Sequence, residues 1–427
     1  MEKFVIEGGH RLEGEVRPSG NKNEALPCLA ATLLTDERII LRNVPRIADV
    51  EVMADVLREL GGEAKWLDEH TLSVCNRDIK TTDLPNELCK KARASILLAG
   101  AMLGRTGRVK LPPPGGDVIG RRRLDTHFLG FQALGVDVQW GGQDYTMEAH
   151  ELRGANIFLD EASVTGTENI LMAAVRSKGT TVLHNAAGEP HVQGLCRLLC
   201  SMGARIEGIG TNVLTVHGTK ALWGTEHTIG TDYLEVGSFI GLAAVTGSPI
   251  TIHGVPVEHM RMIRMVFNRL GVQFEMGDQT IIVPPEQKLE IRNDFHNEIP
   301  KIDDAPWPHF PTDLMSIAIT VATQAAGTVI FFEKMFEGRM FFVDHLISMG
   351  ARIILCDPHR IVIVGPTPLY GAVVESPDVR AGMAMLIASL AAKGQSTIYN
   401  IRQIDRGYEK IDEKLRALGA RIERLPA

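Results

Sequence analysis

The sequence has few cysteines, few aromatic residues, no long uninterrupted apolar run and no excess of basic residues. Its six cysteines form no CxxC pair, so neither a disulfide framework nor a cysteine-ligated metal site is indicated. The formal charge of −7 at pH 7 argues against a general nucleic-acid or acidic-membrane binder, because such surfaces need an excess of Lys and Arg. We therefore expect no metal, no nucleic acid and no membrane among its partners.

The N-terminus, MEKFVIEGGH, carries charges where a signal peptide has an apolar core. The most apolar long stretch, residues 315–332, is interrupted by Ser, Thr, Gln and Gly. This pattern predicts a helix followed by a buried strand rather than a membrane span. With 44% hydrophobic residues in 427, the chain is long enough for two large domains. We expect a cytoplasmic globular protein.

One sequence pattern recurs six times. In each copy a helical pattern ends in Leu or Met, then comes Gly and a strand-like run, at intervals of about 70 residues. The glycines are Gly61, Gly135, Gly203, Gly271, Gly350 and Gly419. Gly at this point suits a left-handed helix C-cap. Because an Ala-rich helix and a strand precede each copy, the repeat is predicted to be helix, strand, helix and strand hairpin, with the first helix tightly packed.

Polar residues that fit neither a core nor a solvated face gather where these helices are expected to begin. Before the first helix of the six repeats they are Lys22, Arg93, Ser163, Asp232, Asp313 and Arg380. Before the second helix they are Arg122, Glu189, Arg339 and Arg406. If the repeats pack with a common orientation, the helix N-termini bring unpaired N–H groups and positive dipole ends to one face, and the basic residues there indicate an anion site. Taken singly, each residue could instead be a solvated residue or a helix N-cap.

The segment Leu111–Asp125, LPPPGGDVIGRRRLD, departs furthest from the repeat. Its prolines and glycines predict a loop, and a long loop in a compact unit is often a functional lid. Asp117 lies close to three arginines in this loop. The alternative is a turn aspartate that caps its own backbone.

These segments together resemble the UDP-N-acetylglucosamine 1-carboxyvinyltransferases, the MurA-type enolpyruvyl transferases, over essentially the whole chain. The resemblance is carried by SGNKNEALP, KARAS, PGGDVIGRRRLD, SVTGTENI, NAAGEP, FPTDL, MFEGR, PDVRAG and IDRGYEKIDEKLRALGARIER. It implies an α/β fold, a two-lobed inside-out barrel of six βαβαββ-type repeats with three per lobe. Lobe one would span residues 21–231 and carry the catalytic loop 111–125. Lobe two would comprise residues 1–20 and 232–427, with the site in the cleft between the lobes.

The family reaction transfers the enolpyruvyl group of phosphoenolpyruvate to the 3-hydroxyl of UDP-N-acetylglucosamine and releases phosphate, the first committed step of peptidoglycan synthesis. It uses no cofactor. A loop cysteine usually donates the proton to carbon 3, and Asp117 stands in that place here, as in some family members. The resemblance therefore implies that Asp117 is the acid, and that fosfomycin, which alkylates the loop thiol of Cys-bearing relatives, leaves this protein active.

The resemblance also assigns the other site residues. Lys22, Asn23, Arg122 and Arg406 should hold phosphoenolpyruvate, with Lys22 and Arg406 counted among the catalytic residues. Arg339 and Arg380 should support its charge, Asp313 should bind the sugar hydroxyl and act as general base, and Arg93 should reach the substrate phosphates. The residues expected to complete substrate binding are Arg122, Arg123, Leu124, Asp125, Thr126, Ser163, Val164, Thr165, Glu189, Asp232 and Met335.

Four positions depart from the commoner family pattern. Arg123 replaces a Pro, Thr165 a Gly, and both Gly188 and Tyr233 an Arg. Two alternatives stay open at this point: an enolpyruvyl transferase for another acceptor, such as shikimate 3-phosphate, or an inactive paralogue that binds the sugar nucleotide as a regulator. A pure repeat scaffold would not need arginines at equivalent helix starts.

The substitution Asp117→Asn tests the assignment of the acid. It keeps the shape of the side chain and removes the proton, so we expect loss of most turnover, by about 100-fold or more, while UDP-N-acetylglucosamine still binds. Steady-state turnover and calorimetric binding of the sugar nucleotide measure the two effects. Near-normal turnover would place the proton donor elsewhere.

Overall fold

The computed structural model describes residues 2–116 and 119–427, and the chain divides into two compact units. The N-terminal unit comprises residues 20–116 and 123–230. The C-terminal unit comprises the described residues among 1–19, 117–122 and 231–427. The chain therefore enters the N-terminal unit at Gly20 and leaves it after Gly230, with one excursion around residues 119–122. Asp117, the expected proton donor, lies outside the described residues.

In its described residues the N-terminal unit holds three repeats. The first contains α1 (Lys22–Ala31), η1 (Thr32–Leu34), β3 (Ile39–Arg42), α2 (Ala48–Glu59), β4 (Glu63–Trp66) and β5 (Leu72–Cys75). The second contains α3 (Asn86–Cys89), η2 (Arg93–Leu97), α4 (Leu98–Thr106), β6 (Arg108–Leu111), α5 (Asp125–Ala133), β7 (Asp137–Gly141) and β8 (Asp144–Glu148). The third contains β9 (Asn156–Phe158), α6 (Val164–Ala174), β10 (Thr180–His184), α7 (Pro190–Ser201), β11 (Arg205–Glu207), β12 (Val213–His217) and β13 (Glu226–Thr228).

The C-terminal unit begins with β1 (Glu2–Gly8) and β2 (Gly14–Val16) and then repeats the same order. Its first repeat contains α8 (Tyr233–Thr246), β14 (Ile250–His253), η3 (Val257–His259), α9 (Arg261–Arg269), β15 (Glu275–Met276) and β16 (Thr280–Val283). The next contains η4 (Phe295–Asn297), β17 (Lys301–Asp303), η5 (Thr312–Leu314), α10 (Met315–Gln324), β18 (Gly327–Phe332), η6 (Arg339–Phe342), α11 (Val343–Ser348), β19 (Ile353–Asp357) and β20 (Arg360–Gly365). The last contains β21 (Val373–Glu375), α12 (Val379–Ala391), β22 (Gly394–Tyr399), α13 (Arg402–Asp405), α14 (Ile411–Ala417) and β23 (Arg421–Pro426).

Each repeat contributes one small sheet with an antiparallel hairpin, and the four-stranded sheets add a parallel strand pair, which the named strands of the three-stranded sheet lack. The orders are β13-β3-β5-β4, β6-β8-β7 and β11-β12-β10-β9 in the N-terminal unit, and β15-β16-β14-β2, β17-β18-β20-β19 and β21-β22-β1-β23 in the C-terminal unit. Strands at the unit boundaries complete the sheet of the first repeat in each unit, since β13 pairs with β3 and β2 pairs with β14. Strand β1 pairs antiparallel with both β22 and β23, so the two ends of the chain close one sheet.

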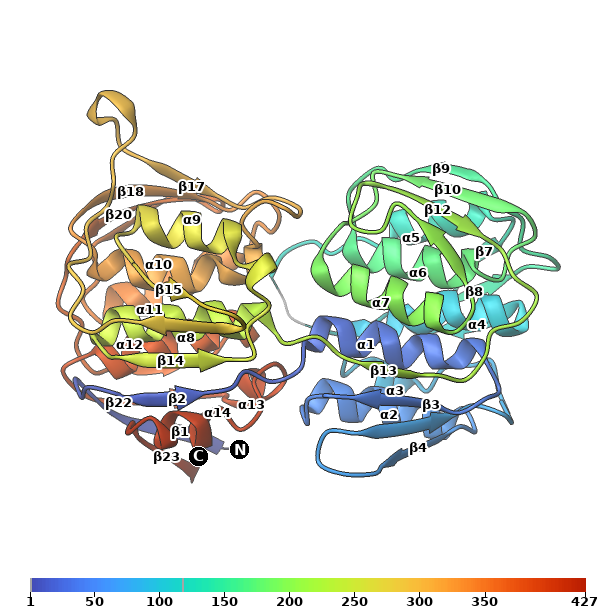
Figure 1. Cartoon of the computed structure of the whole chain (residues 1–427), viewed down its shortest axis with the longest axis horizontal. Helices are drawn as coiled ribbons and strands as arrows, with labels where there is room; N and C mark the ends of the chain where they lie inside the picture. The colour runs from blue at the N-terminus through green and yellow to red at the C-terminus, as the bar shows by residue number, and fades with distance from the viewer. Residues whose placement is uncertain (1, 117–118) are drawn as a thin grey trace. The chain divides into compact units, whose positions relative to one another are not determined.

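The first helix of each repeat lies inside its unit, with the sheets outside it (Figure 1). In the C-terminal unit α8, α10 and α12 are buried along almost their whole length. Close packing needs small residues there: a Cβ at Gly237 or Gly241 of α8 would come within 2.7 Å or 2.6 Å of Leu314 or Ile317. The predicted tight packing of the first helix is confirmed, and each unit is an inside-out α/β barrel.

The six repeat glycines have the backbone conformation that the sequence predicted. They are Gly61, Gly135, Gly203, Gly271, Gly350 and Gly419, and their φ angles lie between 84° and 109°. Each follows the second helix of its repeat, where only Gly adopts this conformation without strain. The predicted helix and strand at residues 315–332 are confirmed as α10 and β18.

The residues placed before the second helix do not all border it directly. Arg406 lies before α14, which begins at Ile411, and caps the end of the short α13. The chain does not continue from α13 as one helix because Lys410 has a positive φ of 45°. Arg122 also lies before its helix, since α5 begins at Asp125.

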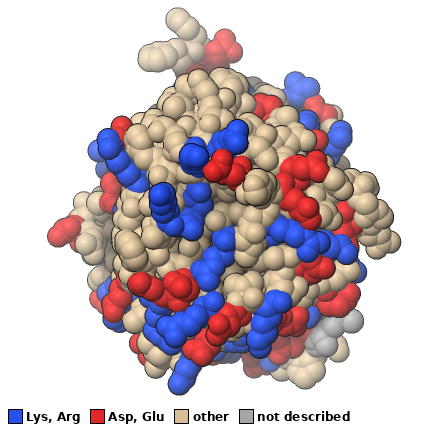
Figure 2. Space-filling model, turned by 90° about the vertical axis from the view of Figure 1, so that its right-hand side faces the viewer, with Lys and Arg blue, Asp and Glu red and all other residues tan. Residues whose placement is uncertain are grey.

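Basic and acidic side chains are intermixed on the face that Figure 2 shows. No helix among the described residues is long and apolar enough to cross a membrane.

Candidate active site

The start of α1 holds an ammonium group in a defined place. Asn21 caps the helix by accepting hydrogen bonds from the backbone N–H groups of Asn23 and Glu24. Lys22 is the first helical residue, and its Nζ lies 2.9 Å from Oδ2 of Asp49, a buried residue in the first turn of α2. Because only 12% and 6% of these two side chains is exposed, the ion pair fixes the direction of Lys22. No sequence pattern singles out Asp49, which resembles any acidic residue in a first helical turn.

Residues 123–126, which are expected from the sequence to bind substrate, are held together by ion pairs and a hydrogen bond within the N-terminal unit. Arg123 lies 2.7 Å from Asp125 and 3.6 Å from Asp160, and Thr126 Oγ1 donates to Asp160 at 2.6 Å. Asp125 raises the pKa of Arg123 above its ordinary value. Arg93, at the start of η2, lies 3.5 Å from the carbonyl oxygen of Arg123. The structure therefore brings Arg93 and residues 123–126 together, and Leu124 is buried beneath them.

Thr165, one of the departures from the family pattern, is bonded to a buried histidine. Its Oγ1 lies 3.2 Å from Nε2 of His127, and Nδ1 of His127 lies 2.9 Å from Nδ2 of Asn169. Burial lowers the pKa of His127 to about 3, so the ring is neutral. Ser163 caps α6 through Gly166 N–H, and Val164 begins that helix. The hydroxyl of Thr165 thus joins the start of α6 to α5.

Glu189 stands at the N-cap position of α7 and is 9% exposed. Other buried acids lie near it. Burial and the charges of Glu189 and Glu24 raise the pKa of Glu168 well above its ordinary value. Glu24, Cys28 and His227 place one possible ligand atom each within 4.8 Å of one another, a grouping that could hold a metal ion. The Glu24 carboxylate and the His227 ring are already hydrogen-bonded to each other at 2.9 Å.

In the C-terminal unit, Asp313 lies between two buried arginines. Its Oδ1 is 3.1 Å from Nη2 of Arg339, and its Oδ2 is 3.1 Å from Nε of Arg380. Arg339 and Arg380 are 6% and 5% exposed. The Asp313 carboxylate is thus paired with two guanidinium groups, and Nε of Arg339 and Nη1 of Arg380 are buried donors without a hydrogen-bond partner among the described residues.

Arg380 is fixed by the start of α12 and by two neighbours. Asp378 caps that helix by accepting from Arg380 N–H at 2.8 Å, and the guanidinium lies 5.4 Å from the ring centroid of Tyr408. Asp232 caps α8, is 2% exposed and has its pKa raised to about 6 by burial, against the opposing charge of Arg380. Asp232 therefore serves its own helix, as the N-cap alternative allowed.

A buried pair of carboxyl groups supports the segments around Asp313. Glu333 accepts hydrogen bonds from Met335 N–H and Phe336 N–H and from the Thr312 hydroxyl, at 2.8 to 3.0 Å. Its other neighbour is Asp304, which is fully buried. Burial and Asp304 together raise the pKa of Glu333 to about 8. The pair joins η5 to the segment that carries Met335 and Arg339, and no sequence feature singled it out.

The described end of the Pro/Gly-rich loop contacts the same segment. Gly338 N–H donates to the Ile119 carbonyl at 3.0 Å, and Arg121 N–H donates to Glu337 Oε1 at 2.9 Å. Arg122 ends this stretch.

Arg406, which follows α13, donates to Gln403 at 2.9 Å.

Tyr233 stands where an Arg is common in the family and belongs to the core. It is 2% exposed, and its ring centroid lies 5.9 Å from those of both His259 and Trp307. Gly188 precedes α7, and its carbonyl accepts from Gln193 at 2.9 Å.

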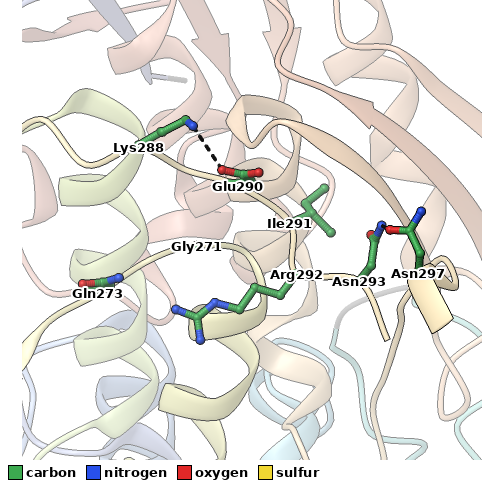
Figure 3. A pocket seen from close by; sticks show the side chains of 8 residues that line it. All are labelled: Gly271, Gln273, Lys288, Glu290, Ile291, Arg292, Asn293 and Asn297. Carbon is green, nitrogen blue, oxygen red and sulfur yellow. Dashed lines mark hydrogen bonds and ion pairs between the residues drawn. The ribbon is translucent and has the colours of Figure 1, made fainter. Parts of the chain in front are cut away.

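A polar hollow of about 470 Å³ lies elsewhere in the C-terminal unit, near the end of α9 (Figure 3). Lys288 and Glu290 form an ion pair of 3.2 Å on its wall. Its lining residues are Gly271, Gln273, Lys288, Glu290, Ile291, Arg292, Asn293 and Asn297. They include none of the residues that the sequence assigned to the site.

Comparison with known proteins identifies the family. The sequence profile described as EPSP synthase (3-phosphoshikimate 1-carboxyvinyltransferase) matches residues 6–415. The fold is similar to that of the enolpyruvyl transferase NikO from Streptomyces tendae, with a TM-score of 0.89 and 24% identity over 100% of this chain and 99% of that one. It is also similar to EPSP synthase from Acinetobacter baumannii, with a TM-score of 0.76 and 16% identity over 100% of both chains. The chain belongs to the enolpyruvyl transferases of the EPSP synthase family.

Within that family, the similar curated relatives carry one particular name, UDP-N-acetylglucosamine 1-carboxyvinyltransferase. The relative from Bradyrhizobium diazoefficiens is 55% identical, covering 99% of this chain and 98% of the relative. The one from Treponema denticola is 54% identical over 99% of both, and the one from Bacteroides thetaiotaomicron is 50% identical over 100% of both. The resemblance stated from the sequence motifs is confirmed.

The substitution Asp313→Ala should destabilise the protein. It leaves two buried guanidinium groups without the counter-charge they share, so we expect the free energy of unfolding to fall by about 3–5 kcal/mol. Denaturant unfolding monitored by circular dichroism measures the loss. The control Glu63→Ala removes an exposed ion pair with Arg38 and should cost less than about 1 kcal/mol. Equal losses in the two variants would contradict the structural role of Asp313.

The stability of the protein should fall in mild alkali because of Glu333. Its pKa of about 8 lies above the ordinary value of 4.5, so the folded protein binds this proton more tightly than the unfolded chain does. The contribution is therefore fully present below about pH 4.5 and is lost as the pH rises through about 8. We expect thermal unfolding midpoints to fall between pH 6 and pH 9, and Glu333→Gln to reduce that slope. Glu337→Gln, which removes an exposed carboxyl with a lowered pKa, should leave the slope unchanged, and an unchanged slope in Glu333→Gln would refute the assignment.

Proposed function

We propose that this protein transfers the enolpyruvyl group of phosphoenolpyruvate to the 3-hydroxyl of UDP-N-acetylglucosamine, the first committed step of peptidoglycan synthesis. Family membership supports the reaction class, and relatives of 50–55% identity over the full length support the acceptor. The observation that carries the proposal is the arrangement of Asp313 between Arg339 and Arg380, because it combines a proton acceptor with cationic groups. The absence of a membrane-spanning helix among the described residues agrees with a cytoplasmic site of action, which we include in the proposal.

The reaction is an addition followed by an elimination. The sugar oxygen bonds to carbon 2 of phosphoenolpyruvate while carbon 3 gains a proton. Carbon 3 then loses a proton, the bond from carbon 2 to the phosphate oxygen breaks, and inorganic phosphate leaves. Atoms and charges balance without an oxidant or cofactor, so side chains need only bind, orient and move protons.

We assign the proton transfers to two aspartates. Asp313 would accept a hydrogen bond from the 3-hydroxyl and take its proton as the new C–O bond forms. Its two ion pairs make it a weak base, so the proton would move late, when the hydroxyl has become more acidic. Asp117 would protonate carbon 3.

The remaining residues would bind substrate charge. Lys22, whose direction is fixed by Asp49, would hold phosphoenolpyruvate with Asn23, Arg122 and Arg406, while Arg339 and Arg380 would stabilise the anionic character of the intermediate. Arg93, Arg123, Leu124, Asp125, Thr126, Ser163, Val164, Thr165 and Met335 would hold the nucleotide. Glu189 and Asp232 would act indirectly in this scheme, since both are buried at helix N-caps.

The test is phosphate release from phosphoenolpyruvate by the full-length protein. We expect phosphate release to depend on UDP-N-acetylglucosamine. Its rate should fall by about 100-fold or more in Lys22→Ala, since that variant removes an interaction made at the reacting group. A colorimetric phosphate assay with each substrate omitted in turn measures it. Release that requires shikimate 3-phosphate instead would identify a different acceptor, and sugar-nucleotide binding without any release would identify an inactive regulator.

A further inference from the structure

The carboxylate of Glu24 is buried in the first turn of α1 and bonded on both oxygens. Its Oε1 lies 2.9 Å from Nε2 of His227 on β13, and its Oε2 accepts a hydrogen bond from Gly230 N–H at 3.2 Å. Glu24 is 4% exposed. Since Lys22 and Asn23 directly precede it, the place of this carboxylate sets the place of the turn that carries them.

The backbone closes around this carboxylate through two glycines. A Cβ at Gly194 of α7 would lie 2.2 to 2.6 Å from the carboxyl atoms of Glu24, and a Cβ at Gly230 would lie 3.0 Å from Oε2. No other residue type would fit at Gly194 without moving Glu24. The carboxylate is therefore held by steric contact as well as by hydrogen bonds, which limits its movement to a small range.

The C-terminal unit contains an equivalent arrangement. Glu235 of α8 accepts a hydrogen bond from Ser19 N–H at 2.8 Å, and its other oxygen lies 2.6 Å from Nζ of Lys414. Both glutamates stand three residues after the N-cap of the first helix, and both bind a backbone N–H of the segment where the chain passes between units. The same position is Gly166 in α6 and Ala381 in α12. The arrangement thus occurs in the first repeat of each unit. Its buried glutamate is paired with His227 in the N-terminal unit and with Lys414 in the C-terminal unit.

We propose that Glu24, held by His227, is a positioning residue for Lys22 and Asn23 in enolpyruvyl transfer; this inference rests on the proposed function. Glu24 acts through the first turn of α1, since its own carboxylate is enclosed. If that turn shifts, the ammonium group of Lys22, which Asp49 orients, is displaced relative to the substrate phosphate. A small displacement of such a group lowers the reaction rate considerably. A stabilising role alone would not need a buried carboxylate, because well-packed apolar residues serve stability as well or better.

The experiment compares Glu24→Gln with Glu226→Gln in the full-length protein. Glu226 lies on the same strand as His227 but forms an exposed ion pair with Arg42, so it is a matched control outside the site. We expect Glu24→Gln to lower kcat/KM for phosphoenolpyruvate by about tenfold or more, with the KM for UDP-N-acetylglucosamine unchanged. Glu226→Gln should match the wild type in both.

Two variants of His227 separate positioning from folding. His227→Gln should reproduce the kinetic defect of Glu24→Gln, and it decides the test if Glu24→Gln does not fold. His227→Lys should retain most of the activity that His227→Gln loses, because Lys414 fills the equivalent place beside Glu235. Thermal unfolding is measured for every variant, since a positioning role predicts kinetic losses that do not follow the unfolding midpoints.

Three results would overturn the proposal. The first is kinetics for Glu24→Gln equal to those of Glu226→Gln. The second is a loss of activity that follows the loss of stability across all variants, which would assign the pair to the fold alone. The third is one tightly bound zinc ion per chain that Glu24→Gln removes, which would make Glu24, Cys28 and His227 a metal site. A wild-type protein without sugar-dependent phosphate release would instead refute the proposed function.

Discussion

The site of this protein depends on the burial of one helix per repeat. Helices such as α8, α10 and α12 are buried along almost their whole length. A charged residue in the middle of such a helix would lose its hydration without gaining a compensating interaction. Charged groups are accommodated where these helices begin, because unpaired N–H groups and the positive end of the helix dipole favour an anion there, whereas a cation at the same place needs an acidic partner. Lys22, Asp313 and Arg380 stand at such positions. The architecture thus confines the chemistry to one end of each helix.

Concentrated charge at these helix starts requires compensation, and the structure supplies it in pairs. Asp49 faces Lys22, and Asp313 is shared by Arg339 and Arg380. Beside Asp304, the buried Glu333 has a raised pKa that favours its neutral form. The ion pairs hold their side chains in one direction, so that the proposed substrate binding needs little reorganisation.

The departures from the family pattern are absorbed by local packing. Thr165 gains a hydrogen-bond partner in the neutral ring of His127. Tyr233 joins His259 and Trp307 in the core, where an arginine would need a counter-charge. Both substitutions leave the ion pairs around Lys22 and Asp313 intact, so they are compatible with the roles proposed for these two residues.

The sequence by itself determined the repeat, the helix-ending glycines, the family and the residues at most helix starts. These are local properties: an αL residue after a helix needs Gly, and a buried helix needs small residues along its length. The short α13 and the turn between Arg406 and α14 were not predicted, because the turn rests on a left-handed backbone at Lys410, a residue type that rarely adopts it. Asp49, Asp304, Glu333 and the Glu24–His227 pair were not visible either. Each pairs residues distant in the sequence or draws its property from burial, and only tertiary packing decides which buried acid meets which base.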